Sequence, residues 1–232
     1  FDSGGISLKP GAGMWDMKAD MSGAASVMGA ALSLAKSRAP VHVMAVAALA
    51  ENMPDGNAQR PGDIVRTFSG KTIEMLNSDA EGRLVLADAN EYVAATHAPR
   101  GIVNIATLTG SIVGALDDQY AGLFARDETL AAQLTKAGEA SGERVWRMPL
   151  HPKYAERMKS DIADIRNIAP SQGPGASLGA HFIGFFVDEK MPWAHIDIAG
   201  VNDASGTPLV PKGQSGFGVR LLDELARTAE AK

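Results

Sequence analysis

The chain has no cysteine, so disulfide bonds and thiolate metal sites are excluded. It has no apolar run near the roughly 18 residues that a membrane-spanning helix needs, and no membrane segment is predicted. Lys and Arg form no cluster and the formal net charge is −5, which argues against a nucleic-acid-binding protein. The lack of cysteine fits a reducing compartment, and we expect a cytoplasmic protein.

Aromatic residues are scarce at 6%, whereas 25 glycines favour close packing of helices on a sheet. Segments typical of strands alternate with segments typical of helices along the chain. Strands are expected at 41–50, 72–76, 101–108, 122–126 and 193–200, and helices at 21–38, 83–97, 128–140, 153–160, 179–187 and 215–230. A buried strand is the alternative at 179–187, and loops are expected at 51–63 and 166–175. The alternation predicts a three-layer α/β fold with a mixed, mostly parallel sheet between helices. No linker or repeat interrupts residues 1–232, so one domain is expected.

The segment NSDAEGRL places Asp79, Glu81 and Arg83 at the boundary between an expected strand and an expected helix. In an extended chain, residues i and i+2 point the same way, so the two carboxylates are expected to converge. Converging carboxylates repel unless a cation lies between them, and oxygen ligands suit Mg²⁺, Mn²⁺ and Zn²⁺. The alternative is a pair of acidic residues favoured at a helix N-terminus by the helix dipole.

Three other polar residues and one turn also occupy positions where elements are expected to begin or end. Asp2, before Gly4 and Gly5, is a candidate ligand or the acceptor of an Asx-turn. Lys9 is a candidate catalytic cation or a solvated loop residue. Asp20 is a candidate ligand or the cap of the helix at 21–38. The TLTG turn at 107–110 follows the most apolar strand, where α/β proteins place their sites.

Other catalytic patterns are absent or misplaced. The five histidines share no ligand spacing, and the sequence has no H-E-x-x-H motif. GASLG at 175–179 matches the G-x-S-x-G pattern of serine hydrolases. That pattern needs a strand before it, whereas SQGPG precedes Ser177 and predicts a loop, so no serine nucleophile is expected.

Four motifs occur in order: FDSGGISLKP (1–10), MKADMSGAA (17–25), KTIEMLNSDAEGRLVLADA (71–89) and NIATLTG (104–110). Together they resemble the leucyl aminopeptidase family (cytosol aminopeptidases, peptidase family M17). The family usually has Thr where this chain has Ser78, a change that keeps the hydroxyl. The resemblance covers essentially the whole chain as the family's C-terminal catalytic domain. It implies an aminopeptidase that hydrolyses the N-terminal residue of peptides, leucine-like residues being preferred.

The resemblance also implies the ligands of a dinuclear metal site. Asp2 would touch both metals, Asp20 would bind one, and Asp79 would bind the other through its side chain and backbone carbonyl. Glu81 would be the second bridging carboxylate, and Lys9 the catalytic lysine that stabilises the developing oxyanion. The metals implied are Mn²⁺ or Zn²⁺, with Mg²⁺ as a further candidate, and they would activate a water.

The remaining implied roles concern the base and the substrate. Arg83 would hold a bicarbonate ion that moves the proton. Thr107, Leu108 and Gly110 would line the substrate cleft with backbone groups, and Met17 would form a wall of the side-chain pocket. The implied assembly is a homo-hexamer acting on peptides.

One departure from the family concerns the start of the chain. The family has a further metal-binding lysine shortly before FDSGG and a smaller N-terminal domain, and neither is present in this sequence. We expect the native protein to be longer and this chain to be an incomplete form. Two alternatives stay open: a two-metal hydrolase of another class, such as a phosphoesterase, and a non-catalytic metal-stabilised scaffold. Metal content measured together with peptide turnover distinguishes the three.

Overall fold

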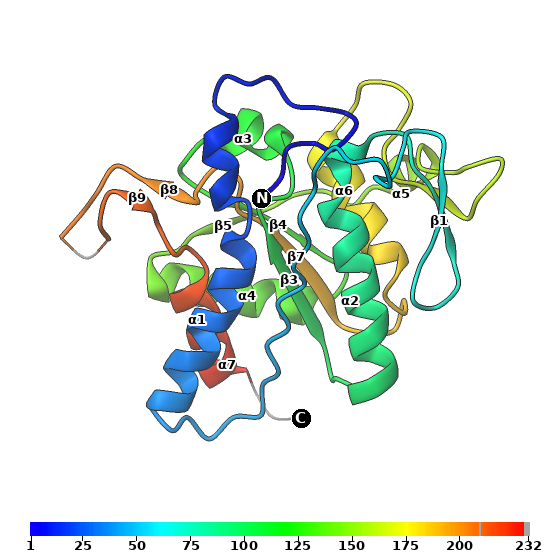
Figure 1. Cartoon of the computed structure of the whole chain (residues 1–232). Coiled ribbons are helices and arrows are strands. Elements are labelled where there is room, and N and C mark those ends of the chain that lie inside the picture. Colours follow the sequence, from blue (N-terminus) through cyan, green and yellow to red (C-terminus); the bar gives the residue numbers. More distant parts are fainter. Residues whose placement is uncertain (209, 230–232) are drawn as a thin grey trace. The chain divides into compact units, whose positions relative to one another are not determined.

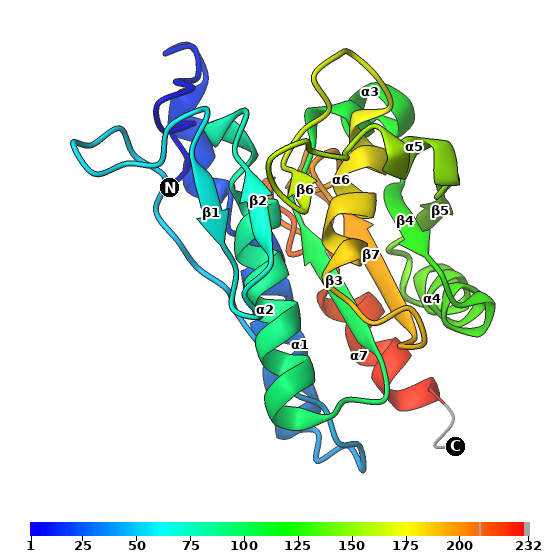
Figure 2. The same cartoon turned by 90° about the vertical axis from the view of Figure 1, so that its right-hand side faces the viewer.

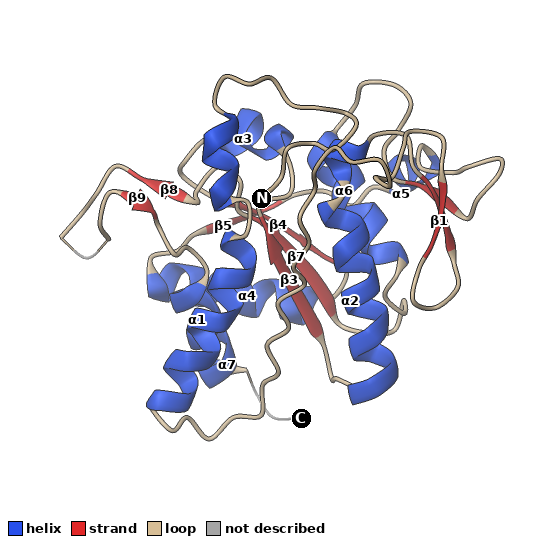
Figure 3. Ribbon diagram, in the orientation of Figure 1, coloured by secondary structure: helices blue, strands red, loops and turns tan. Residues whose placement is uncertain are grey.

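The computed structural model describes residues 1–208 and 210–229 (Figure 1). These residues form two compact units. Unit 1 contains residues 1–20, 48–102 and 149–192, and unit 2 contains residues 21–47, 103–148 and the chain from Trp193 onward. Helices accompany the strands in both units, so the α/β class is confirmed (Figure 3). Among the described residues, no helix combines the length and the apolar character that crossing a bilayer requires.

Unit 2 is built on a four-stranded sheet in the order β3-β7-β4-β5. The strands are β3 (Ile102–Ala106), β4 (Ala121–Ala125), β5 (Val145–Arg147) and β7 (Trp193–Asp197). The sheet is mixed, as predicted, because β4 runs parallel to β5 and antiparallel to β7. A two-stranded ribbon joins β8 (Asp203–Ala204) to β9 (Gly213–Gln214).

The described residues of unit 2 form the helices α1 (Ser22–Lys36), α3 (Gly110–Leu116), α4 (Glu128–Ser141) and α7 (Val219–Thr228). Figure 2 shows α4 and α7 beside the sheet. The core of this unit consists of small and branched apolar side chains from the sheet and from α4 and α7, which is the close packing that the composition favours. They are Ile105, Ala121, Leu123, Ala125, Ala131, Leu134, Ala137, Val145, Ala194, Ile196, Ile198, Val201, Leu221 and Leu225.

Unit 1 has a smaller sheet in the order β1-β2-β6. Its strands are β1 (Ile64–Arg66), β2 (Thr72–Glu74) and β6 (Ile165–Arg166), with β1 antiparallel and β6 parallel to β2. Helix α6 (Gly175–Phe185) packs against α2 (Gly82–His97) and α5 (Pro152–Glu156), as the views in Figures 1 and 2 show. Two short 3-10 helices, η1 (Met14–Ala19) and η2 (Ser78–Ala80), complete the unit.

The long periodic segments were the most predictable. Helices are confirmed at α1, α2, α4 and α6, and strands at β2, β3, β4 and β7. Helix α7 lies within the predicted 215–230, of which residue 230 falls outside the described residues. The predicted helix at 153–160 is shorter and ends at Glu156, and the predicted loop from 166 begins one residue later, after β6. The short elements β1, β5 and α3 were not predicted.

The predicted strand at 41–50 is wrong. These residues form no ladder with any part of the chain that the structure describes, and Val43, Met44 and Leu49 are 51%, 47% and 68% exposed. A strand exists only when a neighbour pairs with its backbone, and apolar composition does not supply that neighbour. Pairing appears just beyond the segment, where Asn52 forms an isolated parallel bridge with Asp2.

Buried Glu143, in the turn after α4, holds the start of α7. Its carboxylate accepts hydrogen bonds from the backbone N–H groups of Gly218 (2.9 Å) and Leu221 (2.8 Å) and from Nε of Arg220 (3.1 Å). The first N–H groups of a helix have no partner within the helix, and a negative charge there is favoured by the dipole. Glu143 therefore acts as a distant cap for α7.

We predict that Glu143→Ala lowers the free energy of unfolding by about 2–3 kcal/mol, because buried donors lose their acceptor. Urea denaturation measures the effect. Glu139→Ala is the matched control, since Glu139 lies on α4 in an exposed pair with Arg144 at 3.6 Å. Equal losses in the two variants would show that Glu143 does not cap α7.

Candidate metal centre

The N-terminal segment FDSGG folds so that Asp2 is buried. Oδ1 of Asp2 accepts the N–H of Gly4 at 2.8 Å, which closes the expected Asx-turn, and also Nδ2 of Asn52 at 2.8 Å. Gly4 has φ +89°, and a Cβ at this position would lie 2.9 Å from Oδ1 of Asp79 and 2.5 Å from the carbonyl of Ser7. Glycine is therefore needed at position 4 for the turn to approach Asp79 so closely.

The segment after β2 supplies two further carboxylates. Asn77 begins η2, and its Oδ1 accepts the N–H of Asp79 at 2.9 Å. Ser78 ties this turn to the N-terminal loop, because its hydroxyl donates to the carbonyl of Gly4 (2.6 Å) and accepts the N–H of Ser7 (2.7 Å). The hydroxyl that Ser78 shares with Thr is thus used structurally.

The expectation that Asp79 and Glu81 lie on an extended segment is wrong. Asp79 has φ −81° and ψ 16° within η2, and Glu81 is already helical at φ −75° and ψ −37°. Asn77 causes the difference, since a side chain that accepts an N–H two residues ahead favours a turn over an extended chain.

Three carboxylates nevertheless converge. Asp2, Asp20 and Glu81 each offer an oxygen within 4.8 Å of the others. Asp20 is the C-cap residue of η1, and Met21 is the N-cap residue of α1. Burial, together with the negative charges of Asp2 and Asp20, raises the pKa of Glu81 to about 7.

Lys9 pairs with Asp2 and with Asp79. Its Nζ is 2.7 Å from Oδ2 of Asp2 and 2.5 Å from Oδ1 of Asp79. Burial alone would lower the pKa of Lys9, but the bonds and charges of these two carboxylates outweigh burial and raise it. Burial raises the pKa of Asp79, and the ammonium group of Lys9 opposes that rise. Asp2 is therefore the residue common to both groups.

The residues fit a divalent cation. Asp2, Asp20, Asp79 and Glu81 supply hard oxygen donors, and Lys9 is the cation paired with two of them. Burial first, and then the negative charges of Asp2 and Asp20, raise the pKa of Glu81. A divalent ion would relieve the repulsion among these charges, and Mg²⁺, Mn²⁺ and Zn²⁺ all accept such donors.

Arg83 and Met17 accompany this cluster in unit 1. Arg83 lies buried in the first turn of α2, and its Nη1 donates to the carbonyl of Asn167 at 2.7 Å. Met17 is half-buried on η1, and its carbonyl accepts the N–H of Asp20 at 3.0 Å. The roles of Arg83 with an anion and of Met17 with a side chain stay predictions.

Two asparagines that were not predicted from the sequence support the cluster. Nδ2 of Asn52 joins Asp2 to the carbonyl of Ser78 at 2.8 Å and 2.9 Å. Asn167 contacts the segment that leads into η2. Both lie in predicted loops, and an isolated asparagine in a loop carries no pattern that distinguishes support of a site from an ordinary turn.

The TLTG segment belongs to unit 2 and begins α3. Oγ1 of Thr109, the N-cap residue, accepts the N–H of Ile112 at 3.3 Å and donates to Oδ2 of Asp197 at 2.6 Å. Oδ1 of the fully buried Asp197 accepts the N–H groups of Leu108 (3.1 Å) and Thr109 (3.4 Å). The conformation of this segment is thus fixed by Asp197. A substrate-lining role for Thr107, Leu108 and Gly110 stays a prediction.

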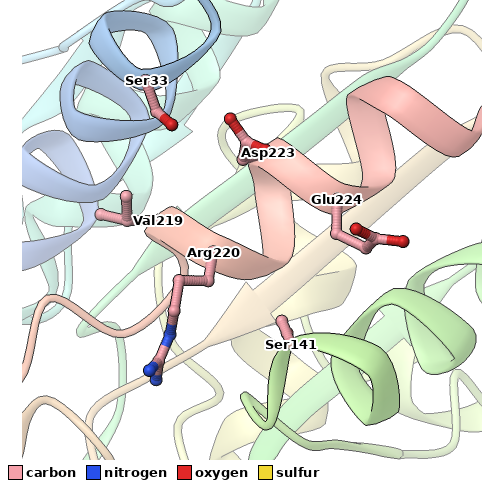
Figure 4. Close-up of a pocket in the computed structure, with 6 residues that line it drawn as sticks. All are labelled: Ser33, Ser141, Val219, Arg220, Asp223 and Glu224. Carbon is pink, nitrogen blue, oxygen red and sulfur yellow. The ribbon is translucent and has the colours of Figure 1, made fainter. Parts of the chain in front are cut away.

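Two other features lie apart from the carboxylates. Ser177 of the GASLG motif is buried inside α6 rather than on a turn between a strand and a helix. In unit 2, a pocket is lined by Ser33, Ser141, Val219, Arg220, Asp223 and Glu224, from α1, α4 and α7 (Figure 4). Two of its charged groups are paired within the fold, Arg220 with Glu143 and Asp223 with Arg227.

The chain matches known proteins over almost all of its length. A family model described as "Cytosol aminopeptidase family, catalytic domain" matches residues 1–223. "Probable cytosol aminopeptidase" of Rhodopseudomonas palustris (strain BisB18) is 54% identical over 228 residues, which are 97% of this chain and 45% of that protein. "Cytosol aminopeptidase" of Rickettsia prowazekii (strain Madrid E) is 52% identical over 229 residues, 98% of this chain and 46% of that protein.

A solved structure shares the fold. "Bottromycin maturation enzyme BotP in complex with Mn" superimposes with a TM-score of 0.89 at 40% identity, covering 98% of this chain and 50% of that chain. The present chain therefore spans about half the length of the proteins that it matches.

Burial raises the pKa of Asp197 to about 6, although its hydrogen bonds with Thr109, Ala199 and Leu108 act in the opposite direction. The unfolded value is about 3.9, so the folded chain binds the proton more tightly. Between pH ~4 and ~6 the folded state holds more protons, and the contribution of Asp197 to the free energy of unfolding falls as the pH rises.

We predict that Asp197→Asn removes this dependence. The free energy of unfolding of the variant, measured relative to that of wild type, should rise by about 3 kcal/mol between pH 4 and pH 7. This is the equivalent of a pKa shift of roughly two units. Urea titrations at each pH, with chelator present, measure the difference. Asp203→Asn controls for loss of a negative charge, since Asp203 is exposed on β8 of the same unit. If Asp197→Asn keeps the wild-type dependence of stability on pH, this dependence does not come from the raised pKa of Asp197.

Proposed function

The chain belongs to the cytosol aminopeptidase family, and we propose that it carries the catalytic part of a metal-dependent enzyme that removes N-terminal residues from peptides. The observation that carries the proposal is the convergence of Asp2, Asp20 and Glu81 with Lys9 beside them. Peptide hydrolysis needs groups that polarise a carbonyl and activate a water, and a carboxylate-held metal next to a cation meets that need.

The proposed ligands would hold two divalent ions, with Asp2 and Glu81 shared by both, Asp20 serving one ion and Asp79 the other. The position of Asp2 supports its bridging role, because Asp2 belongs both to the group with Asp20 and Glu81 and to the group with Lys9 and Asp79. When bound, such metals act as Lewis acids and lower the pKa of a coordinated water. Mn²⁺ is the first candidate, because the related BotP structure contains Mn.

The remaining proposed catalytic work belongs to two cations of the chain. Lys9, kept protonated by Asp2 and Asp79, offers a positive charge to the carbonyl oxygen as it becomes an oxyanion. Arg83 stays protonated and cannot act as a base itself. Its donor fork can hold bicarbonate, which would take up and release the proton. Its location in the first turn of α2, where N–H groups favour an anion, supports this role.

Substrate recognition is proposed for Thr107, Leu108 and Gly110 through backbone groups and for Met17 through its side chain. The free amine of the peptide would bind a metal, which selects N-termini, and the apolar Met17 favours leucine-like residues. We further propose a cytoplasmic homo-hexamer acting on peptides, in keeping with the family.

The direct test is hydrolysis of leucine p-nitroanilide by the 232-residue chain with added Mn²⁺. Turnover that chelator abolishes and Mn²⁺ restores is expected. Hydrolysis of p-nitrophenyl phosphate under the same conditions tests the phosphoesterase alternative and should be absent. Leucine p-nitroanilide turnover that survives chelator, or a chain that binds Mn²⁺ and releases only phosphate, would contradict the proposal.

We predict that Glu81→Gln lowers turnover at least about 10³-fold with little change in the far-UV circular dichroism, because a bridging charge is lost while the side-chain shape is kept. Glu156→Gln is the control, since Glu156, the last residue of α5, forms an exposed ion pair with Lys159. Turnover by Glu81→Gln at the wild-type rate would show that Glu81 is not a bridging ligand.

A further inference from the structure

Strand β6 continues into Asn167, whose side chain is fully buried. The parallel register places Ile73 opposite Ile165 and Glu74 opposite Arg166. The backbone N–H of Asn167 then donates to the carbonyl of Glu74 at 3.0 Å. Beyond this bond, the residues that follow β2 turn into η2, so regular pairing with the segment after β6 stops.

The side chain of Asn167 replaces the missing strand partner. Its Oδ1 accepts the N–H of Leu76 at 2.8 Å and lies 3.4 Å from the N–H of Asn77. Its Nδ2 donates to the carbonyl of Asn77 at 2.6 Å and lies 3.1 Å from Sδ of Met75. A primary amide presents one acceptor and two donors, so it satisfies backbone groups of both kinds at once. The residues leading into η2 are thereby held although no strand lies beside them.

Asn167 also holds the far end of the same segment. Its backbone carbonyl accepts Nη1 of Arg83 at 2.7 Å in buried surroundings. The segment 77–83 carries Asp79 and Glu81 between these two attachments. One buried residue therefore contacts the start and the end of the loop that provides two of the proposed metal ligands.

We propose that Asn167 is a positioning residue for the metal centre, fixing both ends of segment 77–83 so that Asp79 and Glu81 are placed for a divalent ion. The proposal rests on the proposed function, which assigns these carboxylates to metal. Asn167 acts through the backbone of Leu76 and Asn77 and through Arg83. Partners that orient metal ligands typically change metal affinity 10- to 100-fold when they are lost.

Two variants separate the donor role from general packing. Asn167→Asp keeps the shape and the acceptor but sets an oxygen against the carbonyl of Asn77. Asn167→Ala removes all of the hydrogen bonds of the side chain. Asn104→Ala is the matched control, because Asn104 is also buried and accepts Nε1 of Trp193 at 2.7 Å in unit 2.

Titration calorimetry with Mn²⁺ alone and hydrogen exchange read by mass spectrometry, the latter with chelator present, provide two independent readouts. We expect both Asn167 variants to bind Mn²⁺ on the order of 10- to 100-fold more weakly than wild type. The peptide covering residues 75–83 should exchange faster in both variants. Asn104→Ala should leave the Mn²⁺ affinity and the exchange of this peptide at wild-type values.

Wild-type Mn²⁺ affinity and wild-type exchange in the Asn167 variants would overturn the proposal, whatever happens to peptide turnover. If Asn167→Ala fails to fold, Asn167→Asp carries the test, because its volume and acceptor are retained. If the wild-type chain itself binds no Mn²⁺, the metal assignment fails, and with it the proposed role of Asn167 toward a metal. Loss of turnover with unchanged Mn²⁺ affinity would also count against that role.

Discussion

Electrostatic repulsion among carboxylates is the constraint on which the organisation of unit 1 depends. Asp2, Asp20 and Glu81 each offer an oxygen within 4.8 Å of the others, and Lys9 pairs with both Asp2 and Asp79. Burial raises the pKa of Glu81, and the negative charges of Asp2 and Asp20 raise it further. Such an arrangement persists only where the surrounding structure fixes each ligand and where a cation offsets the charge.

The surrounding structure provides that fixation with neutral amides and hydroxyls. Asn52 binds Asp2, Ser78 binds the N-terminal loop, and Asn167 holds the segment leading into η2. Neutral donors orient the carboxylates without neutralising them, so their charge stays available for a metal. Lys9 is the charged exception, and its double pairing with Asp2 and Asp79 keeps it protonated for the role proposed for it.

Much of the fold followed from the sequence because long periodic segments have local causes. Helices α1, α2 and α4 combine small or apolar residues at helical spacing with clear ends, and β3 and β7 are apolar runs of strand length. The segment 41–50 has the same composition as these strands, but pairing is decided by distant residues, and the prediction failed there. The two-residue strand β6 was missed for a related reason, since its register with β2 is a tertiary feature.

In the candidate site, too, the residues could be identified from local sequence, whereas their geometry depends on tertiary contacts. The ordered motifs identified Asp2, Lys9, Asp20 and Glu81 as candidates, and the structure brings them together in unit 1. The local geometry was different from the expectation, because Asn77 bends the chain into η2 and directs Asp79 toward Lys9. Asn167 binds backbone groups of Leu76 and Asn77 that have no partner in the ladder of β2 and β6. Which groups these are is decided only when β2 and β6 pair, so the sequence alone does not reveal them.

The most direct test of the metal centre is the anomalous diffraction of crystals of this chain grown with Mn²⁺, recorded at the manganese edge. A strong anomalous peak bounded by carboxylate oxygens of Asp2, Asp20 and Glu81 is the expected result. Absence of a peak there, with the three carboxylates in the same arrangement, would show that their convergence serves something other than a metal.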